Sequence, residues 1–203
     1  MNGEDRENNV TLELLQAIDR RDDVTQRHLA DSLGIALGLA NAYLKRCVRK
    51  GLVKVQQAPA NRYLYYLTPK GFAEKSRLTA IYLRDSFDFY RRASASISRT
   101  LQQCEYSGVR TVALAGASEL AEITLLRARE SAVRVTSVYD PEHRADQFLG
   151  LPVLRKPHGL TRVDGVVVTA IDASESSCRT LAGAIAPARL FVPDLFGISG
   201  EVS

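Results

Sequence analysis

The sequence predicts two fold classes in one chain, an α+β N-terminal half and an α/β C-terminal half, joined by a long helix. Three observations lead to this prediction. Over roughly the first 50 residues, apolar side chains recur every three or four positions, and two strand-like runs follow. From Pro69 onward, only Gly71 interrupts a helical pattern before Gly108. About 95 residues then alternate β-branched runs with helical stretches, which is typical of a parallel sheet.

Three helices are predicted before the first strand. Apolar spacing predicts the first over residues 10–20. Thr25 can cap the second with its hydroxyl, and Gly34 can take the left-handed conformation that ends it. The third helix follows directly and runs to about Lys50. Its inward positions are Ala40, Leu44, Cys47 and Val48, and its outer face carries Gly38, Leu39, Asn41, Ala42, Lys45, Arg46 and Arg49.

A charged hairpin completes this first module. Gly51 ends the third helix, and residues 52–57 and 62–68 predict two strands around a turn at 58–61. The stretch 24–70 carries eight Lys or Arg residues and one acidic residue, a local net charge of +7 that leaves −3 for the rest of the chain. Together these features predict a winged helix-turn-helix that binds double-stranded DNA, with the third helix in the major groove and the hairpin at the backbone or minor groove.

Candidate DNA contacts follow from the outer face of the third helix and from the wing. Asn41 could pair with adenine and Lys45 with guanine, and the remaining basic residues are expected to neutralise phosphates. Arg62 at the tip of the wing is a groove or phosphate contact. The full predicted set is Arg27, His28, Leu39, Asn41, Ala42, Lys45, Arg46, Arg49, Lys54 and Arg62. The alternative is that the basic side chains are simply solvated and that the winged helix binds another protein.

A packing seam runs along the predicted connecting helix. Its positions alternate by four and three residues, at Leu83, Phe87, Tyr90, Ser94, Ile97, Leu101 and Cys104. Pairing of two copies along this seam would place two recognition helices over palindromic half-sites. We therefore expect a homodimer through residues 76–107. The alternative is that the seam packs on the chain's own C-terminal domain.

The C-terminal domain is predicted to be a small Rossmann-like parallel sheet of four or five strands. Strands are expected over 111–115, 133–139, 151–154, 165–171 and 189–192, with helices over 119–131 and 174–186. Ligands of such sheets bind beyond the carboxyl ends of the strands. The candidate cofactor-binding residues at that edge are Gly116, Ala117, Ser118, Asp140 and Thr169.

A nucleotide site is only partly supported by these residues. Asp140 is placed to bond the ribose of NAD(H) or of a nucleotide sugar. Ser118 and Ala121 replace two glycines of the GxGxxG pattern, and the first helical turn is acidic where a phosphate would bind. The sequence thus leaves open a nucleotide-type ligand or a ligand-free dimerisation domain. No catalytic or metal site is expected, because Ser118 lacks a GxSxG elbow and the three histidines share no metal-ligand spacing.

The cellular compartment follows from what the sequence lacks. Cys47, Cys104 and Cys178 make neither a metal cluster nor an even disulfide set, and the start MNGEDRENN has no apolar signal-peptide core. No apolar run approaches the roughly 18 residues of a membrane-spanning helix. We therefore expect a cytoplasmic protein with no membrane partner.

Two resemblances agree with this layout. LADSLGIALGLANAYLKRCVRKGLVKV and YYLTPKGF resemble MarR-type regulators, especially those associated with exopolysaccharide loci, over about the first 75 residues. This resemblance implies a dimeric transcriptional regulator. VALAGASELAEI, SVYDPEH and FLGLPVL resemble the Rossmann-like domain of sugar-modifying acyltransferases and of winged-helix proteins similar to the Rex redox repressors. That second resemblance implies a nucleotide or nucleotide-sugar pocket.

The sequence therefore predicts a winged helix-turn-helix over 1–75, a connecting and dimerisation helix over 76–107 and a Rossmann-like regulatory domain over 108–203. The predicted function is a non-enzymatic, sequence-specific transcriptional regulator whose C-terminal domain senses a small-molecule effector or mediates dimerisation. Two alternatives stay open. One is an enzyme that uses a nucleotide or nucleotide sugar and is recruited by its N-terminal domain, and the other is a winged-helix adaptor that does not bind DNA.

Overall fold

The computed structural model describes residues 3–20, 24–59, 62–170, 181, 183 and 185–196. The chain divides into two compact units, residues 1–87 and 88–203. The predicted fold class is confirmed: a winged helix and a parallel-sheet domain share the long helix α4 (Pro69–Tyr106), which contributes to both units. The helix predicted over 174–186 falls for the most part outside the described residues, as do the wing-tip positions 60–61.

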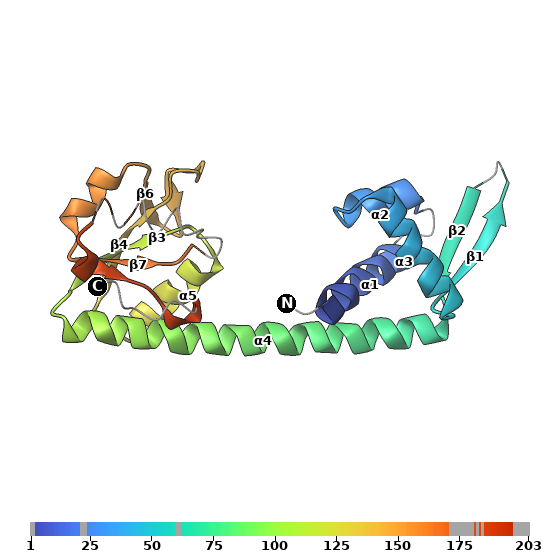
Figure 1. The fold of residues 1–203 in the computed structure, drawn as a ribbon, viewed down its shortest axis with the longest axis horizontal. Coiled ribbons are helices and arrows are strands. Elements are labelled where there is room, and N and C mark those ends of the chain that lie inside the picture. Colours follow the sequence, from blue (N-terminus) through green and yellow to red (C-terminus); the bar gives the residue numbers. More distant parts are fainter. Residues whose placement is uncertain are drawn as a thin grey trace. The chain divides into compact units, whose positions relative to one another are not determined.

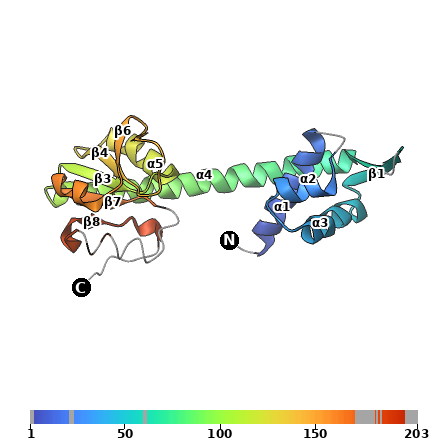
Figure 2. The same cartoon turned by 90° about the horizontal axis from the view of Figure 1, so that it is seen from above.

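The N-terminal unit consists of three helices, a hairpin and the first part of α4 (Figure 1). Its elements are α1 (Gly3–Arg20), α2 (Gln26–Ser32), α3 (Leu37–Arg49), β1 (Val53–Ala58) and β2 (Arg62–Leu67). The strands β1 and β2 pair antiparallel, and Figure 2 shows β1 next to α3. The helix α1 begins two turns earlier than the apolar spacing predicts, because apolar spacing marks only the part of a helix that packs on the core.

The core of this unit draws on every element. Its buried side chains are Leu12, Leu14, Leu15, Ile18, Val24, Leu29, Leu44, Cys47, Leu52, Val53, Tyr65 and Leu78. Thr68 ties the base of the hairpin to α4: its Oγ1 donates to the Gly51 carbonyl at 2.6 Å and accepts from the Gly71 N–H at 3.0 Å. At Gly71 a Cβ would lie 2.0 Å from the Leu52 carbonyl oxygen, so only glycine fits where α4 crosses the chain.

The C-terminal unit is a six-stranded sheet in the order β5-β6-β4-β3-β7-β8. The elements are β3 (Thr111–Ala115), α5 (Glu119–Ala128), β4 (Arg134–Tyr139), β5 (Gln147–Phe148), β6 (Leu151–Leu154), β7 (Gly165–Val168) and β8 (Leu190–Phe191), with 3-10 helices η1 (Pro157–Arg162), η2 (Pro187–Arg189) and η3 (Asp194–Phe196). All neighbouring strands are parallel except β5 and β6. The sequence missed β5, because two residues are too few for a periodic pattern.

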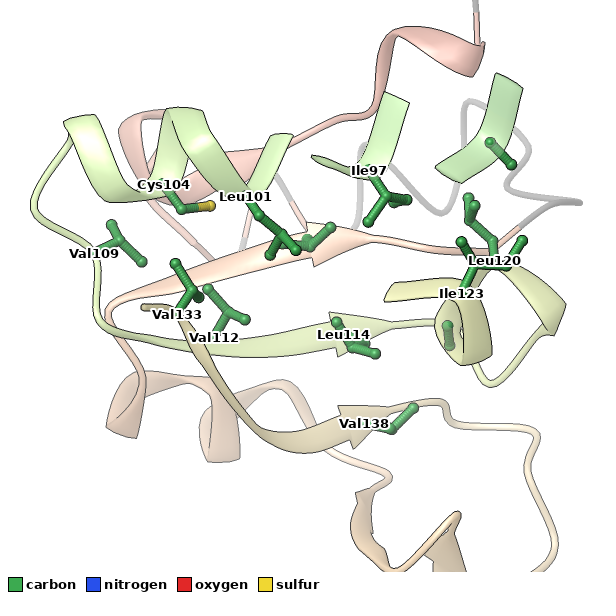
Figure 3. Close-up of a cluster of buried hydrophobic side chains, with 13 residues drawn as sticks. Ile97, Leu101, Cys104, Val109, Val112, Leu114, Leu120, Ile123, Val133 and Val138 are labelled. Carbon is green, nitrogen blue, oxygen red and sulfur yellow. The ribbon is translucent and has the colours of Figure 1, made fainter. Parts of the chain in front are cut away.

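One face of this sheet is covered by the C-terminal half of α4. Ile97, Leu101 and Cys104 pack with β-strand residues such as Val112 and Leu114 in a single buried cluster (Figure 3). Burial raises the pKa of the Cys104 thiol to about 12, as expected of a core residue and not of a reactive thiolate. The predicted dimer seam is therefore wrong over this half of α4, where the same apolar positions are buried within the chain's own domain.

Candidate nucleic-acid interface

The helix-turn-helix is built by local signals that the sequence carries. Thr25 caps α2, with its Oγ1 accepting from the His28 N–H at 3.1 Å. Gly34 then takes the left-handed conformation at φ 61°, and the Ile35 N–H donates to the Ala30 carbonyl at 3.1 Å. The turn is thereby closed and leads directly into α3.

The predicted recognition helix faces solvent as its spacing implies. Ala40, Leu44 and Cys47 are buried in the unit's core. The opposite side exposes Gly38, Leu39, Ala42, Lys45 and Arg49. On the elements that contact α3, Arg27 and His28 of α2 and Lys54 of β1 are also exposed. Exposed basic side chains are therefore carried by α3 and by two elements that contact it, α2 and β1, which suits a polyanionic partner.

Two residues of the predicted set are placed differently. Asn41 is half-buried, and its Oδ1 is buried with no hydrogen-bond partner among the described residues. The predicted pairing of Asn41 with adenine requires another conformation of this side chain, and it stays a prediction. Arg46 forms an ion pair with Glu7 of α1, which offsets its charge. The sequence could not indicate this pair, because 39 positions separate the two residues.

The remaining basic residues of the module have mixed roles. Lys70 donates from Nζ to the Lys50 carbonyl at 3.0 Å and so satisfies a free carbonyl at the end of α3. Arg62 begins β2, while its side chain lies outside the described part of the structure. Its predicted contact at the wing tip therefore stays a prediction.

A groove between α3 and the hairpin was not foreseen. Its volume is about 320 Å³, and it is lined by Gln26, Leu44, Lys45, Val48, Arg49, Val55, Tyr63 and Tyr65. Val48, predicted to face inward, is 37% exposed, as is Val55 across from it. Two of the lining residues are hydrogen-bonded, because Gln26 donates from Nε2 to Tyr65 Oη at 3.2 Å. The run of tyrosines in β2 was the available signal, because alternate residues of a hairpin face opposite sides.

The five candidate cofactor-binding residues do come together at the carboxyl edge of the sheet. Asp140 accepts from the Ala117 N–H at 3.0 Å through Oδ2. Ser118 donates from Oγ to the Thr169 carbonyl at 2.5 Å, and Thr169 donates from Oγ1 to the Gly116 carbonyl at 2.7 Å. Gly116 has φ 114°, and a Cβ there would lie 2.5 Å from the backbone of Ala170.

These contacts engage three backbone N–H groups of the turn and of the first turn of α5. Ser118 Oγ accepts from the Leu120 and Ala121 N–H groups at the start of α5, and Asp140 holds the Ala117 N–H. Through Oδ1, Asp140 also accepts from the N–H groups of Glu142 and His143. The Asp140 carboxylate therefore competes with a phosphate for the Ala117 N–H, which disfavours a pyrophosphate at this turn.

The described residues form neither a metal-binding cluster nor a membrane-spanning helix. No group of three or more His, Cys, Asp or Glu side chains could hold a metal ion there. Among the helices in the described ranges, none is both long enough and apolar enough to span a bilayer.

Comparison with known proteins identifies the N-terminal module. Residues 7–54 match the family model described as winged helix-turn-helix DNA-binding. This match runs from α1 into β1 and therefore includes the whole of α2 and α3. No curated protein matched the chain.

Solved structures give more distant similarities. MepR of Staphylococcus aureus, a transcription regulator of the multidrug efflux pump MepA, is 21% identical over 39% of this chain and 61% of its own, with a TM-score of 0.36. FabT of Streptococcus pneumoniae, in complex with DNA, is 22% identical over 38% of this chain and 58% of its own, with a TM-score of 0.32. Human N-acetylserotonin methyltransferase, in complex with SAM, is 14% identical over 93% of this chain and 74% of its own, with a TM-score of 0.35. The chain thus spans less than two thirds of the length of MepR or FabT.

Proposed function

We propose that this protein is a sequence-specific, homodimeric transcriptional regulator of the MarR type that binds double-stranded DNA through α3. The observation that carries the proposal is the coincidence of fold and charge. In the winged helix-turn-helix, the exposed face of α3 is the side that enters the major groove. Lys45 and Arg49 lie on that face, and Arg27, His28 and Lys54 are exposed on elements that contact α3.

The electrostatics favour DNA over a protein partner for this face. Between residues 24 and 70 the net charge is +7. A surface of this kind releases counterions when it meets a duplex, so affinity falls log-linearly with salt, by a slope of about −0.9 for each phosphate neutralised. An adaptor that binds a protein would show no such slope over the same range.

We also propose that a second copy of the chain covers part of α4. Within the N-terminal unit, α4 exposes Tyr82, Leu83 and Phe87, at 52%, 46% and 59%. Arg84 and Asp85 lie between Leu83 and Phe87 in the sequence. A second copy in antiparallel orientation therefore brings a basic and an acidic residue to the proposed interface from each chain. The proposed interface is narrower than the 76–107 expected from the sequence, and it supplies the two recognition helices that a palindromic site requires.

The C-terminal unit is proposed to be a regulatory domain without enzymatic activity. An enzyme of the nucleotide-dependent class would need the turn after β3 to hold a phosphate, and the internal contacts of Asp140 and Ser118 oppose this. An effector of another class, bound elsewhere on this unit, would act allosterically only if it favours one arrangement of the recognition helices over another.

The proposal is tested by fluorescence anisotropy with duplex DNA over a range of salt concentrations. The double variant Lys45→Glu/Arg49→Glu is expected to lose at least 100-fold in affinity. The reason is that the two substitutions together make the face that meets the phosphates more negative by about four charge units. Arg129→Glu, an exposed position on α5's C-terminal cap, is the control and is expected to bind like the parent protein. Equal binding by the double variant, or binding that does not change with salt, would refute the proposal.

A further inference from the structure

The first turn of α3 presents apolar surface within an otherwise basic face. Leu37 and Leu39 are 43% and 46% exposed, on either side of Gly38. Neither side chain belongs to the core of the N-terminal unit, so neither is placed there by internal packing. Large exposed apolar side chains that flank the basic residues of a binding face indicate contact with an apolar group of the partner.

Gly38 is not required by the fold of the chain itself. A Cβ built at this position meets no atom of the described residues within 4 Å, and the backbone there is not in the left-handed region. Gly71 is the contrast, because a Cβ there would lie 2.0 Å from a carbonyl oxygen. Glycine within a helix is unfavourable relative to alanine, so a glycine without an internal reason suggests close approach by an external partner. Ala42 is exposed one turn later on the same side of α3, and its small side chain also lets a partner approach the backbone.

Hydrogen-bonding side chains are scarce in this half of the helix. Among residues 37–44 only Asn41 and Tyr43 carry polar groups, and both are half-buried. The Asn41 Oδ1 is enclosed by the protein in this side-chain conformation. Along α3, Lys45 in the third turn is the first exposed residue whose side chain can form hydrogen bonds.

The partner that combines negative charge with an apolar group is thymine-containing duplex DNA. In the major groove, the C5-methyl of thymine is the apolar feature that distinguishes one base pair from the others. We propose that Leu37 and Leu39 recognise thymine methyl groups, and that Gly38 and Ala42 let the backbone of α3 come close enough for this contact. This inference rests on the proposed function and names the chemical feature of DNA that the site selects.

The test replaces thymine by uracil, which keeps every hydrogen-bonding group and lacks the methyl. A duplex selected by the full-length protein from random sequences is resynthesised with uracil at one thymine position at a time. We expect the affinity to fall roughly fourfold at each contacted position, the value of one buried methyl group. In Leu37→Ala and Leu39→Ala the same replacement should change the affinity less than twofold, each at its own position, because the methyl no longer has its partner.

Two variants control the assignment. Lys54→Ala should bind both duplexes more weakly and keep the fourfold discrimination, since a phosphate contact carries no base information. Gly38→Ala should bind the selected duplex more weakly while the thermal midpoint of the variant stays the same or rises. An unchanged or higher midpoint shows that the weaker binding comes from a blocked approach of α3 to DNA and not from unfolding of the protein.

The possible results distinguish this inference from the proposed function. If no duplex binds at any salt concentration, the proposed function fails. If duplexes bind with a steep salt dependence and uracil is tolerated at every position, DNA binding stands and the reading of thymine methyls is overturned. If uracil weakens binding equally in the parent protein and in both leucine variants, the methyl is recognised by other residues and the assignment to Leu37 and Leu39 is overturned.

Discussion

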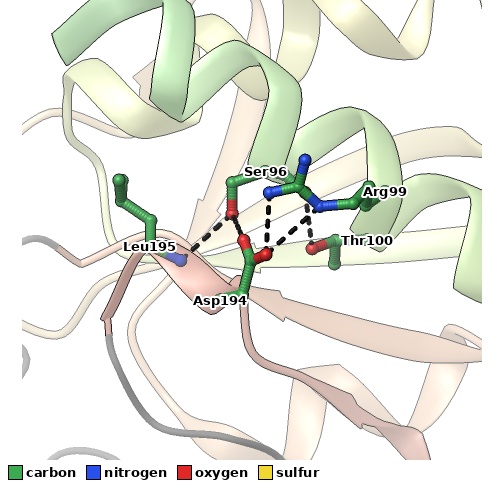
Figure 4. A network of polar contacts seen from close by, with 5 residues as sticks. All are labelled: Ser96, Arg99, Thr100, Asp194 and Leu195. Carbon is green, nitrogen blue, oxygen red and sulfur yellow. Dashed lines mark hydrogen bonds and ion pairs between the residues drawn. The ribbon is translucent and has the colours of Figure 1, made fainter.

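Ser96 on α4 and Asp194 in η3 are joined by a hydrogen bond from Ser96 Oγ to the Asp194 carboxylate (Figure 4). Arg99 donates two more hydrogen bonds to Oδ2 of the same carboxylate, and the Leu195 N–H donates to Ser96 Oγ at 3.1 Å. Ser96 is buried, whereas Asp194 and Arg99 are largely exposed. These contacts fasten the chain after β8 to the helix that covers the sheet.

This clamp predicts a pH-dependent contribution to stability. The hydrogen bonds from Ser96 and Arg99 lower the pKa of Asp194 below its usual 3.8. A lowered pKa means that the stabilisation is present above the unfolded-state value and is lost as pH falls through the folded-state value. Asp194→Asn should therefore cost about 1 kcal/mol or less at pH 7, given the exposure of the group, and the difference should be smaller at an acidic pH below the usual 3.8 of the carboxyl group. Thermal unfolding followed by circular dichroism at both pH values measures it, and an equal difference at both would contradict the account.

The ion pair between Glu7 and Arg46 predicts a gain of DNA affinity on removing the acid. Glu7→Gln frees Arg46 and removes a negative charge near the binding face. We expect a roughly threefold rise in affinity at low salt and a salt slope steeper by up to about 0.9, the value of one additional phosphate contact. Glu130→Gln, which removes the exposed acid paired with Arg127 on the C-terminal unit, is the matched control and should leave both quantities unchanged. A weaker-binding Glu7→Gln would mean that the pair holds Arg46 in its binding position.

The exposed apolar side chains of α4 predict a dimer that one substitution can break. Phe87→Glu places a charge at the most exposed of these positions, so we expect sedimentation equilibrium to show a monomer where the parent protein is a dimer. Ala95→Glu, also at an exposed position on α4 and about 80° around the helix from Phe87, should remain dimeric. Phe87→Glu should still bind a duplex that carries one half-site. A parent protein that is monomeric at the concentrations used for DNA binding would refute the proposed interface.

The contacts of Asp140 predict a structural role for this residue. Because its carboxylate accepts from three backbone N–H groups, Asp140→Ala should lower the free energy of unfolding by roughly 2 kcal/mol. Asp140→Asn keeps an acceptor and should lower it by less. Calorimetric titration of the parent protein with NADH or with nucleotide sugars is expected to show no binding at micromolar concentrations. Micromolar binding that Asp140→Ala abolishes, without unfolding, would restore the ligand site expected from the sequence.

Local chemistry made much of the N-terminal unit predictable. Thr25, Gly34 and Gly51 mark the ends of α2 and α3, and each acts through atoms within a few residues. Likewise the spacing of Ala40, Leu44 and Cys47 shows which side of α3 is buried. For the same reason the outward position of Lys45 and Arg49 follows from the sequence. Signals of this kind require no knowledge of distant parts of the chain.

The tertiary structure alone decided what covers each apolar or polar group. The seam on α4 reads as one continuous pattern in the sequence, yet Ile97 is buried against the chain's own sheet while Phe87 is exposed. The ion pair of Arg46 with Glu7 and the hydrogen bond of Asp140 with the Ala117 N–H likewise join residues that are far apart in the sequence. The spacing of apolar residues predicts which face of an element is apolar. The residue type shows whether a group can be charged or can accept hydrogen bonds. Only the packing of segments far apart in the chain determines which partner each group meets, because that depends on distances through space and not along the sequence.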